Sequence, residues 1–104
     1  MRISLAKDIG PFLTRAQPAA SLCARILKSA TRETVVLDFT EVVQMSPSFA
    51  NTLFFNLLQR MNVDALRNQV RIENAAPYVL DAINEAIARK LDRRASLSSY
   101  LEPA

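Results

Sequence analysis

Histidine is absent from this sequence, and its absence removes several kinds of chemistry at once. Most zinc sites, histidine-based catalytic triads and imidazole acid–base catalysis all require an imidazole ring. Cys23 is the only cysteine, so it can form no internal disulfide and cannot build a metal site alone. It falls on the apolar side of an expected helix, which favours a buried, unreactive thiol. We therefore expect no enzyme, no cofactor and no metal site.

Glycine is almost as scarce, with Gly10 as its single example. One glycine cannot make a dinucleotide-binding or Walker-type phosphate loop, so nucleotide binding by either device is excluded. No apolar run approaches the ~18 residues that would span a bilayer. Lys7 and Asp8 interrupt the apolar start before a signal-peptide core can form. We expect a cytoplasmic protein that does not enter a membrane.

Charge and composition are those of an ordinary globular domain. The 104 residues are 50% hydrophobic and 22% charged, with a net charge of +3. Arg89, Lys90, Arg93 and Arg94 supply much of the basic excess. Cations near the end of a helix offset its dipole, and a nucleic-acid surface would also need exposed aromatic residues among them. Nucleic-acid binding is therefore disfavoured and is kept only as an alternative.

Hydrophobic periodicity predicts three strands that alternate with three helices. The expected elements are a strand at 1–5, a helix from about 14 to 29, a strand at 34–39, a helix from 46 to about 61, a strand at 69–73 and a helix from about 77 to 91. Thr14 and Gln17 have the spacing of a capping box, with Pro18 in the first helical turn. Residues 34–39 are apolar on both faces, which predicts a central strand covered on both sides.

This order of elements predicts an α/β fold with a small, mostly parallel or mixed sheet and helices packed on it. We expect residues 1–92 to form a single domain and residues 93–104 to be a tail or an edge strand. Three strands make a small sheet, so a fourth strand from the tail or from a second chain would extend it.

The junction between the second strand and the second helix is the most informative part of the sequence. Asp38 lies at the end of the strand and suits the role of a turn acceptor. Ser46 and Pro47 have the residue types of a helix N-cap and first position. Ser48 lies in the first turn, where a phosphate would be held by the helix N-terminus. The junction therefore suits partner binding or covalent modification such as phosphorylation.

The stretch Leu37-Asp38-Phe39-Thr40-Glu41-Val42-Val43-Gln44-Met45-Ser46-Pro47-Ser48-Phe49-Ala50 resembles the core signature of STAS domains, the fold of bacterial anti-sigma factor antagonists. It is more similar still to the STAS-like family of unknown function. Members of that family have a strand ending in Leu-Asp-Phe and a helix that opens at a Phe-Ala pair. Thr14-Arg15-Ala16-Gln17-Pro18-Ala19 resembles their upstream helix start, and Asn74 resembles an asparagine that follows their next strand.

The resemblance implies a STAS-like fold and a regulatory protein that works by binding a partner. For the antagonists that partner is a histidine-kinase-like ATPase that phosphorylates a serine, and here the corresponding residue is Ser48. Three residues depart from the antagonist pattern: Ser46 replaces an aspartate, Pro47 replaces a serine and Phe49 replaces a glycine. Phe49 is expected to point into the core, so partner binding can persist without a phosphorylation switch.

We therefore predict a non-enzymatic regulatory module that binds a protein, either a histidine-kinase-like ATPase or a transcription regulator. Ser48 is the candidate phosphorylation residue. The predicted partner-binding residues are Asp38, Thr40, Glu41, Ser46, Ser48 and Phe55. Phe55 lies off the apolar stripe of its helix, so it either packs under a neighbouring helix or belongs to an exposed contact patch. The alternatives are a self-assembling structural module, such as a homodimer, and a weak nucleic-acid-binding accessory protein.

Overall fold

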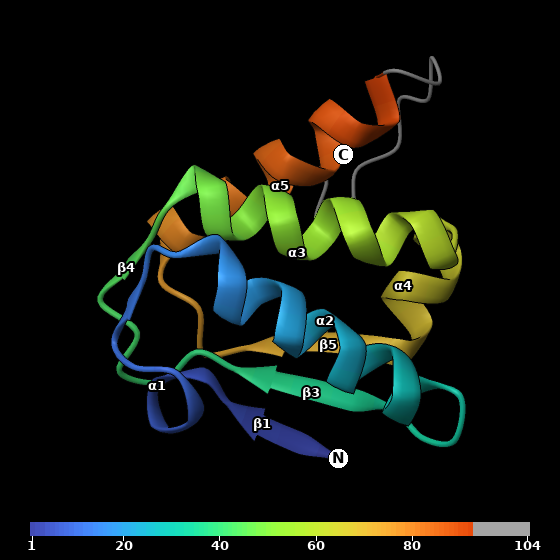
Figure 1. Ribbon diagram of the computed structural model, residues 1–104, viewed down its shortest axis with the longest axis horizontal. Helices are drawn as coiled ribbons and strands as arrows, with labels where there is room; N and C mark the ends of the chain where they lie inside the picture. The colour runs from blue at the N-terminus through green and yellow to red at the C-terminus, as the bar shows by residue number, and fades with distance from the viewer. Residues whose placement is uncertain (93–104) are drawn as a thin grey trace.

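A parallel sheet lies along one side of the molecule, with helices packed on one of its faces (Figure 1). The computed structural model describes residues 1–92. The sheet contains β1 (Arg2–Ser4), β3 (Val35–Asp38) and β5 (Val70–Glu73) in the order β1-β3-β5, and both pairs are parallel. The α/β class and the three main strands are therefore confirmed, and this sheet is wholly parallel.

Successive side chains along each strand point to opposite faces of the sheet, and one face is buried while the other is open. Ile3, Leu37 and Ile72 are in register and point toward the helices, and the first two are fully buried. On the other face, Val36 is half-buried and lies in register between Arg2 and Arg71. β3 is central, as predicted, but the prediction that both of its faces are covered is wrong for the described residues. Val36 alone cannot make an apolar face when its neighbours on both strands are arginines.

Three long helices cover the buried face. They are α2 (Ala16–Ala30), α3 (Pro47–Arg60) and α5 (Pro77–Asp92), and α3 lies between the other two (Figure 1). The apolar stripe of α3, from which Phe55 departs, faces the core, because Phe49, Leu53 and Leu57 are fully buried and Met61 after the helix is half-buried. Cys23 of α2 is buried in the same core, as expected. No helix among residues 1–92 is long and apolar enough to cross a membrane.

The predicted capping box at the start of α2 is wrong. The N-cap of α2 is Arg15, whose side chain makes no capping hydrogen bond. Thr14 is kept out of the helix because the chain just before it is paired elsewhere: the Leu13 carbonyl accepts from the Ser46 N–H at 2.8 Å, and the Thr14 carbonyl accepts from Ser46 Oγ at 3.1 Å. Pro18 does lie in the first turn, where its missing N–H is harmless.

Four short elements have no counterpart in the sequence prediction. They are α1 (Leu5–Asp8), β2 (Phe12–Leu13), β4 (Gln44–Met45) and α4 (Val63–Gln69). β2 and β4 form a separate parallel pair, although about thirty residues of chain lie between them. α4 begins at Asn62, whose side chain accepts from the Ala65 N–H at 2.8 Å. Gly10 separates α1 from β2, and its φ of 141° suits glycine.

The C-terminal segment 93–104, predicted as a tail or an edge strand, lies outside the described residues. Arg93 and Arg94 of the basic cluster lie there as well. Of the other two basic residues, Arg89 is exposed in the last turns of α5 and Lys90 is half-buried.

Candidate functional site

Asp38 joins the carboxyl ends of neighbouring strands. Its Oδ1 accepts hydrogen bonds from Thr40 Oγ1 at 2.6 Å, from the Thr40 N–H at 3.0 Å and from Asn74 Nδ2 at 3.0 Å. Thr40 follows β3 and Asn74 follows β5, so one carboxylate holds two chain segments together. The hydrogen bonds from the Thr40 hydroxyl, the Asn74 amide and the Thr40 N–H hold the pKa of Asp38 well below its usual range. Asp38 is therefore the turn acceptor that its position predicts.

Arg2 adds the third strand to this network. Its guanidinium lies 3.3 Å from Asp38 Oδ2 and 2.9 Å from Glu73 Oε1. Arg2 belongs to β1, Asp38 to β3 and Glu73 to β5, so the ion pairs cross the open face of the sheet. The charges of the two carboxylates are thereby partly neutralised at this edge.

The turn after Asp38 has a fixed and uncommon backbone. The Val42 N–H donates to the Phe39 carbonyl at 3.1 Å, and Glu41 has a φ of 67° while Thr40 keeps a negative φ. Those signs are the ones of a type II turn, whose third position favours glycine or asparagine. Asn74, with a φ of 59°, is the other non-glycine residue with positive φ in residues 1–92. Both strained positions lie beside Asp38, whose hydrogen bonds hold the two segments in place.

A shallow pocket of about 260 Å³ opens beside this turn, lined by Arg2, Ser4, Lys7, Asp38, Thr40 and Glu41. A carboxylate that already accepts from several donors is a poor proton acceptor near neutral pH, so Asp38 suits a positioning role. Within residues 1–92, no three His, Cys, Asp or Glu side chains gather in a way that could hold a metal ion.

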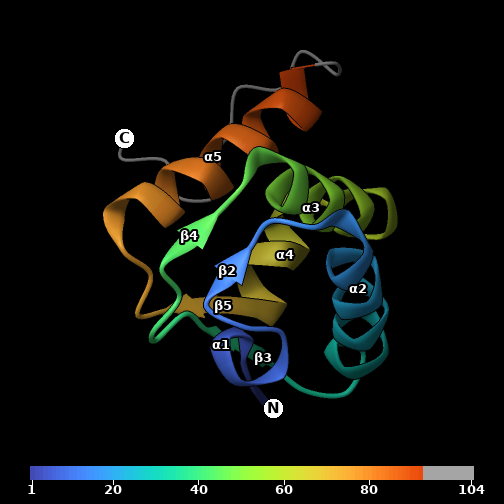
Figure 2. The same ribbon diagram turned by 60° about the vertical axis from the view of Figure 1, so that its left-hand side comes forward.

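Three large hydrophobic side chains are exposed next to the same turn. Phe12 is 58% exposed, Val43 53% and Tyr78 51%, and together we call them the apolar patch. Hydrogen bonds link their segments: the Val43 N–H donates to the Pro11 carbonyl at 2.7 Å, and the Tyr78 hydroxyl donates to the Val43 carbonyl. Figure 2 shows β4 between β2 and the first turn of α5, so the three residues come from neighbouring segments.

The two serines of the junction have different environments. Ser46 is half-buried, and its hydroxyl accepts from the Phe49 N–H at 3.1 Å while it donates to the Thr14 carbonyl at 3.1 Å. Ser46 is thus the N-cap of α3, as predicted, with Pro47 at the first position. Ser48 is exposed in the first turn, and Phe49 is fully buried, as its apolar character predicts.

The sequence comparison bears on this same region. The family model described as a STAS-like domain of unknown function (DUF4325) matches residues 19–80, which is more than half of the chain. The chain belongs to this STAS-like family. No curated protein and no solved structure matches it. The matched region of the STAS-like domain includes Asp38, Ser48, Asn74 and Tyr78, and its observed sheet agrees with the fold that the resemblance implied.

The structure of the STAS-like domain brings most of the predicted residues to one end. Asp38, Thr40 and Glu41 line the shallow pocket, and Ser46 and Ser48 begin the helix that follows β4. Phe55 lies apart from them. Its ring is half-buried, and the ring centroid is 5.9 Å from Lys90 Nζ of α5.

Sequence reasoning missed Arg2, Phe12 and Tyr78 at this end of the domain. An arginine in a first strand and single aromatic residues in a two-residue strand and a first helical turn carry no local signal. The register of β1 with β3 places Arg2, the register of β2 with β4 places Phe12, and the hydrogen bond to the Val43 carbonyl places Tyr78. Asn74 is identified only through the family resemblance, although asparagine also tolerates the left-handed backbone that follows β5.

Proposed function

We propose that this STAS-like domain is a non-enzymatic regulatory module that binds another protein through the end where its strands finish. We call this region the strand-end surface, and it consists of Phe12, Thr40, Glu41, Val43, Ser48 and Tyr78. The apolar patch is the observation that carries the proposal, because three large hydrophobic side chains are each more than half exposed on adjoining segments. Clustered exposed apolar residues mark interaction sites more often than scattered ones do.

The hydrogen bonds that hold the loop segments of the strand-end surface support the same proposal. The turn at Thr40 and Glu41 is held by hydrogen bonds to Asp38, and the segment at Val43 is held by the Pro11 carbonyl and the Tyr78 hydroxyl. A surface that is already ordered loses less conformational entropy when a partner binds. Aromatic residues on ordered segments often contribute most of the binding energy at interfaces.

The partner that the resemblance implies is a histidine-kinase-like ATPase, and a transcription regulator is the alternative partner. Ser48 is an exposed residue of the strand-end surface, and by the resemblance it corresponds to the serine that is phosphorylated in anti-sigma factor antagonists. A phosphate there would add up to about two negative charges at the N-terminal turn of α3, where the helix dipole favours them. Such a phosphate would alter the charge that the partner meets without disrupting the helix.

The test is a pull-down from the native host, followed by titration of the recovered partner against purified variants. We expect Phe12→Ser and Tyr78→Ser each to weaken binding about tenfold or more, which is typical of aromatic anchors. Met61→Ser is the matched control, since Met61 is a half-buried apolar residue at the other end of α3. Equal binding by all three variants and the unaltered chain would refute the strand-end surface.

Ser48 requires its own comparison. We expect Ser48→Asp to change the affinity for the partner, and Ser21→Asp, at an exposed serine of α2, to leave it unchanged. Mass spectrometry of the protein from its host tests whether Ser48 carries phosphate. If both aspartate variants bind like the unaltered chain and no phosphate is found, the domain binds without this switch.

The open face of the sheet favours self-association as a second candidate function. Arg2 and Arg71 share this face with Asp38 and Glu73, so two copies could place opposite charges against each other. Sedimentation at rising protein concentration tests this candidate, and a monomer throughout would reject it.

A further inference from the structure

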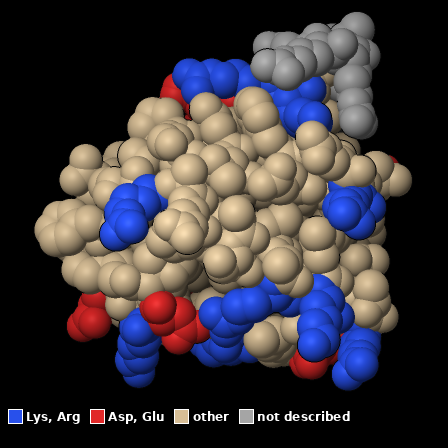
Figure 3. Space-filling view, in the orientation of Figure 1, with Lys and Arg blue, Asp and Glu red and all other residues tan. Residues whose placement is uncertain are grey.

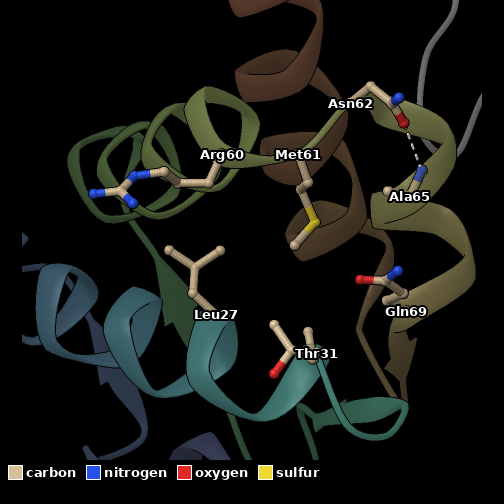
Figure 4. A pocket seen from close by; sticks show the side chains of 8 residues that line it. Leu27, Thr31, Arg60, Met61, Asn62, Ala65 and Gln69 are labelled. Carbon is tan, nitrogen blue, oxygen red and sulfur yellow. Dashed lines mark hydrogen bonds between the residues drawn. The ribbon is translucent and has the colours of Figure 1, made fainter.

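A second hollow lies at the other end of the helices, away from the strand-end surface. It has a volume of about 550 Å³ and lies between the last turns of α2, the last turn of α3 and α4 (Figure 4). Leu27 and Met61 face each other across it, and Ala65 of α4 adds to its apolar wall. We call it the terminal hollow.

Few polar groups line the terminal hollow, and the charge among them is positive. Arg60 is the only charged side chain that lines it, and no acidic side chain does. Arg60 has no ion pair or hydrogen bond to its guanidinium within residues 1–92. The Gln69 amide points into the hollow (Figure 4), whereas the Asn62 side chain already accepts from the Ala65 N–H. The Thr31 hydroxyl, which also lines the hollow, donates to the Lys28 carbonyl at 3.1 Å. Arg60 and Gln69 thus offer polar groups on opposite sides of the hollow, with the Arg60 guanidinium directed away from Gln69 (Figure 4).

Arg60 lies at the border between this hollow and a smaller one. The smaller hollow, of about 200 Å³, continues along α2 and α3 and shares Leu27 and Arg60 with the first. The face of α2 and α3 seen in Figure 3 has few charged side chains across its middle, with charges gathered at its lower and upper edges. An anion near Arg60 would thus meet no acidic side chain among the residues that line either hollow.

The volume of the terminal hollow indicates whether it binds a small molecule or a long segment of a partner protein. Small-molecule sites have volumes of about 300 to 1,000 Å³ and combine apolar walls with a few polar groups. The terminal hollow lies in this range, and α4 closes one of its sides (Figure 4). The two hollows adjoin along α2 and α3, but α4 closes this end, so the geometry favours a short ligand over a helix of several turns.

We propose that the terminal hollow binds a small amphipathic carboxylate, with its apolar chain or ring between Leu27 and Met61 and its carboxylate at Arg60. Figure 4 shows the Gln69 amide and the Arg60 guanidinium on opposite sides of Leu27 and Met61, so Gln69 would donate to a polar atom at the far end of the ligand. This site is separate from the strand-end surface, so it would remain valid if the proposed function were wrong. Because the ligand would join α2 to the α3–α4 turn, it would also stabilise the folded domain by mass action.

The test is a titration of the full chain, labelled with ¹⁵N, by decanoate, indole-3-acetate and decanol, followed by NMR. Decanoate and indole-3-acetate distinguish an aliphatic chain from an aromatic ring, and decanol lacks the charge. We expect saturable shifts at Leu27, Met61 and Ala65 with at least one acid, and weaker binding of decanol. Absence of saturable shifts with both acids, or shifts confined to Phe12 and Tyr78, would overturn the proposal.

Two variants assign the contacts. Arg60→Gln should weaken the acid about two- to fivefold, the range for an exposed ion pair, and should leave decanol unchanged. Arg32→Gln is the matched control, because Arg32 is exposed just after α2 and does not line the hollow. Ala65→Phe should fill the hollow and abolish binding. If Arg60→Gln and Arg32→Gln bind the acid equally, Arg60 does not hold the carboxylate and the proposed site is wrong.

Discussion

Replacing Ser46 by alanine would separate structure from function at the serine-rich junction. The Ser46 hydroxyl caps α3 through the Phe49 N–H and also bonds the Thr14 carbonyl at the entry to α2. Loss of an N-cap hydroxyl destabilises a protein by about 1 kcal/mol. Loss of the second hydrogen bond adds about 0.5 to 1 kcal/mol. We therefore expect Ser46→Ala to lower the free energy of unfolding by roughly 1.5 to 2 kcal/mol.

Two further variants divide this effect between its two hydrogen bonds. Ser46→Asp keeps an acceptor for the Phe49 N–H and adds a favourable charge at the helix N-terminus, but it cannot donate to Thr14. Its loss should therefore be about 0.5 to 1 kcal/mol at most. Ser48→Ala is the matched control in the same turn, where an exposed residue should change stability by less than about 0.5 kcal/mol.

Urea unfolding followed by far-ultraviolet circular dichroism gives these free energies. For a domain of this size, a loss of 1 kcal/mol lowers the melting temperature by roughly 4 to 8 °C, so thermal melts give a second measure. If Ser46→Ala and Ser48→Ala are equally stable, the hydroxyl of Ser46 does not join α3 to α2 and the reasoning is refuted.

Three other predictions follow from the core and from Asp38. Phe49→Gly would restore the residue of the antagonist pattern, yet it should destabilise the domain by about 3 to 5 kcal/mol or more, because the ring is fully buried; a urea midpoint near that of the unaltered chain would contradict this. Burial raises the pKa of the Cys23 thiol, so the native chain should react with a thiol reagent much more slowly than the chain in urea, and equal rates would show an accessible thiol. The pKa of Asp38 is lowered in the folded state, so its ionised form adds stability above its unfolded pKa of about 3.9, and that stability is lost as the pH falls toward the folded pKa. The difference in urea midpoint between the unaltered chain and Asp38→Asn should therefore be largest near neutral pH and shrink in acid, and a difference independent of pH would contradict the hydrogen-bond network.

Local signals account for the parts of the fold that were predicted well. The hydroxyl of Ser46 and the ring of Pro47 each act within one turn of α3, so their effect can be read without the rest of the chain. The burial of Phe49 and Leu53 follows from helical spacing alone. The capping box failed because Leu13 and Thr14 bond to Ser46, a residue more than thirty positions away.

Short elements escaped prediction because contacts beyond their own sequence stabilise them. β2 and β4 have two residues each, and each strand exists only because the other lies beside it. α4 has a recognisable cap at Asn62, but seven residues are too few for a clear periodic pattern. Such elements depend on tertiary packing, which a window of sequence does not contain.

The sequence by itself determined the α/β class, the family, the three main strand–helix pairs and the start of α3 at Ser46, because periodicity, capping and a family signature are local properties. Only the tertiary structure decided which residues meet at the end of the sheet. The register of β1, β3 and β5 brings Arg2 and Asn74 to Asp38, and the pairing of β2 with β4 brings Phe12 to the segment of Val43. Both are contacts between residues about thirty positions apart or more, and their geometry follows from the packing of the whole chain.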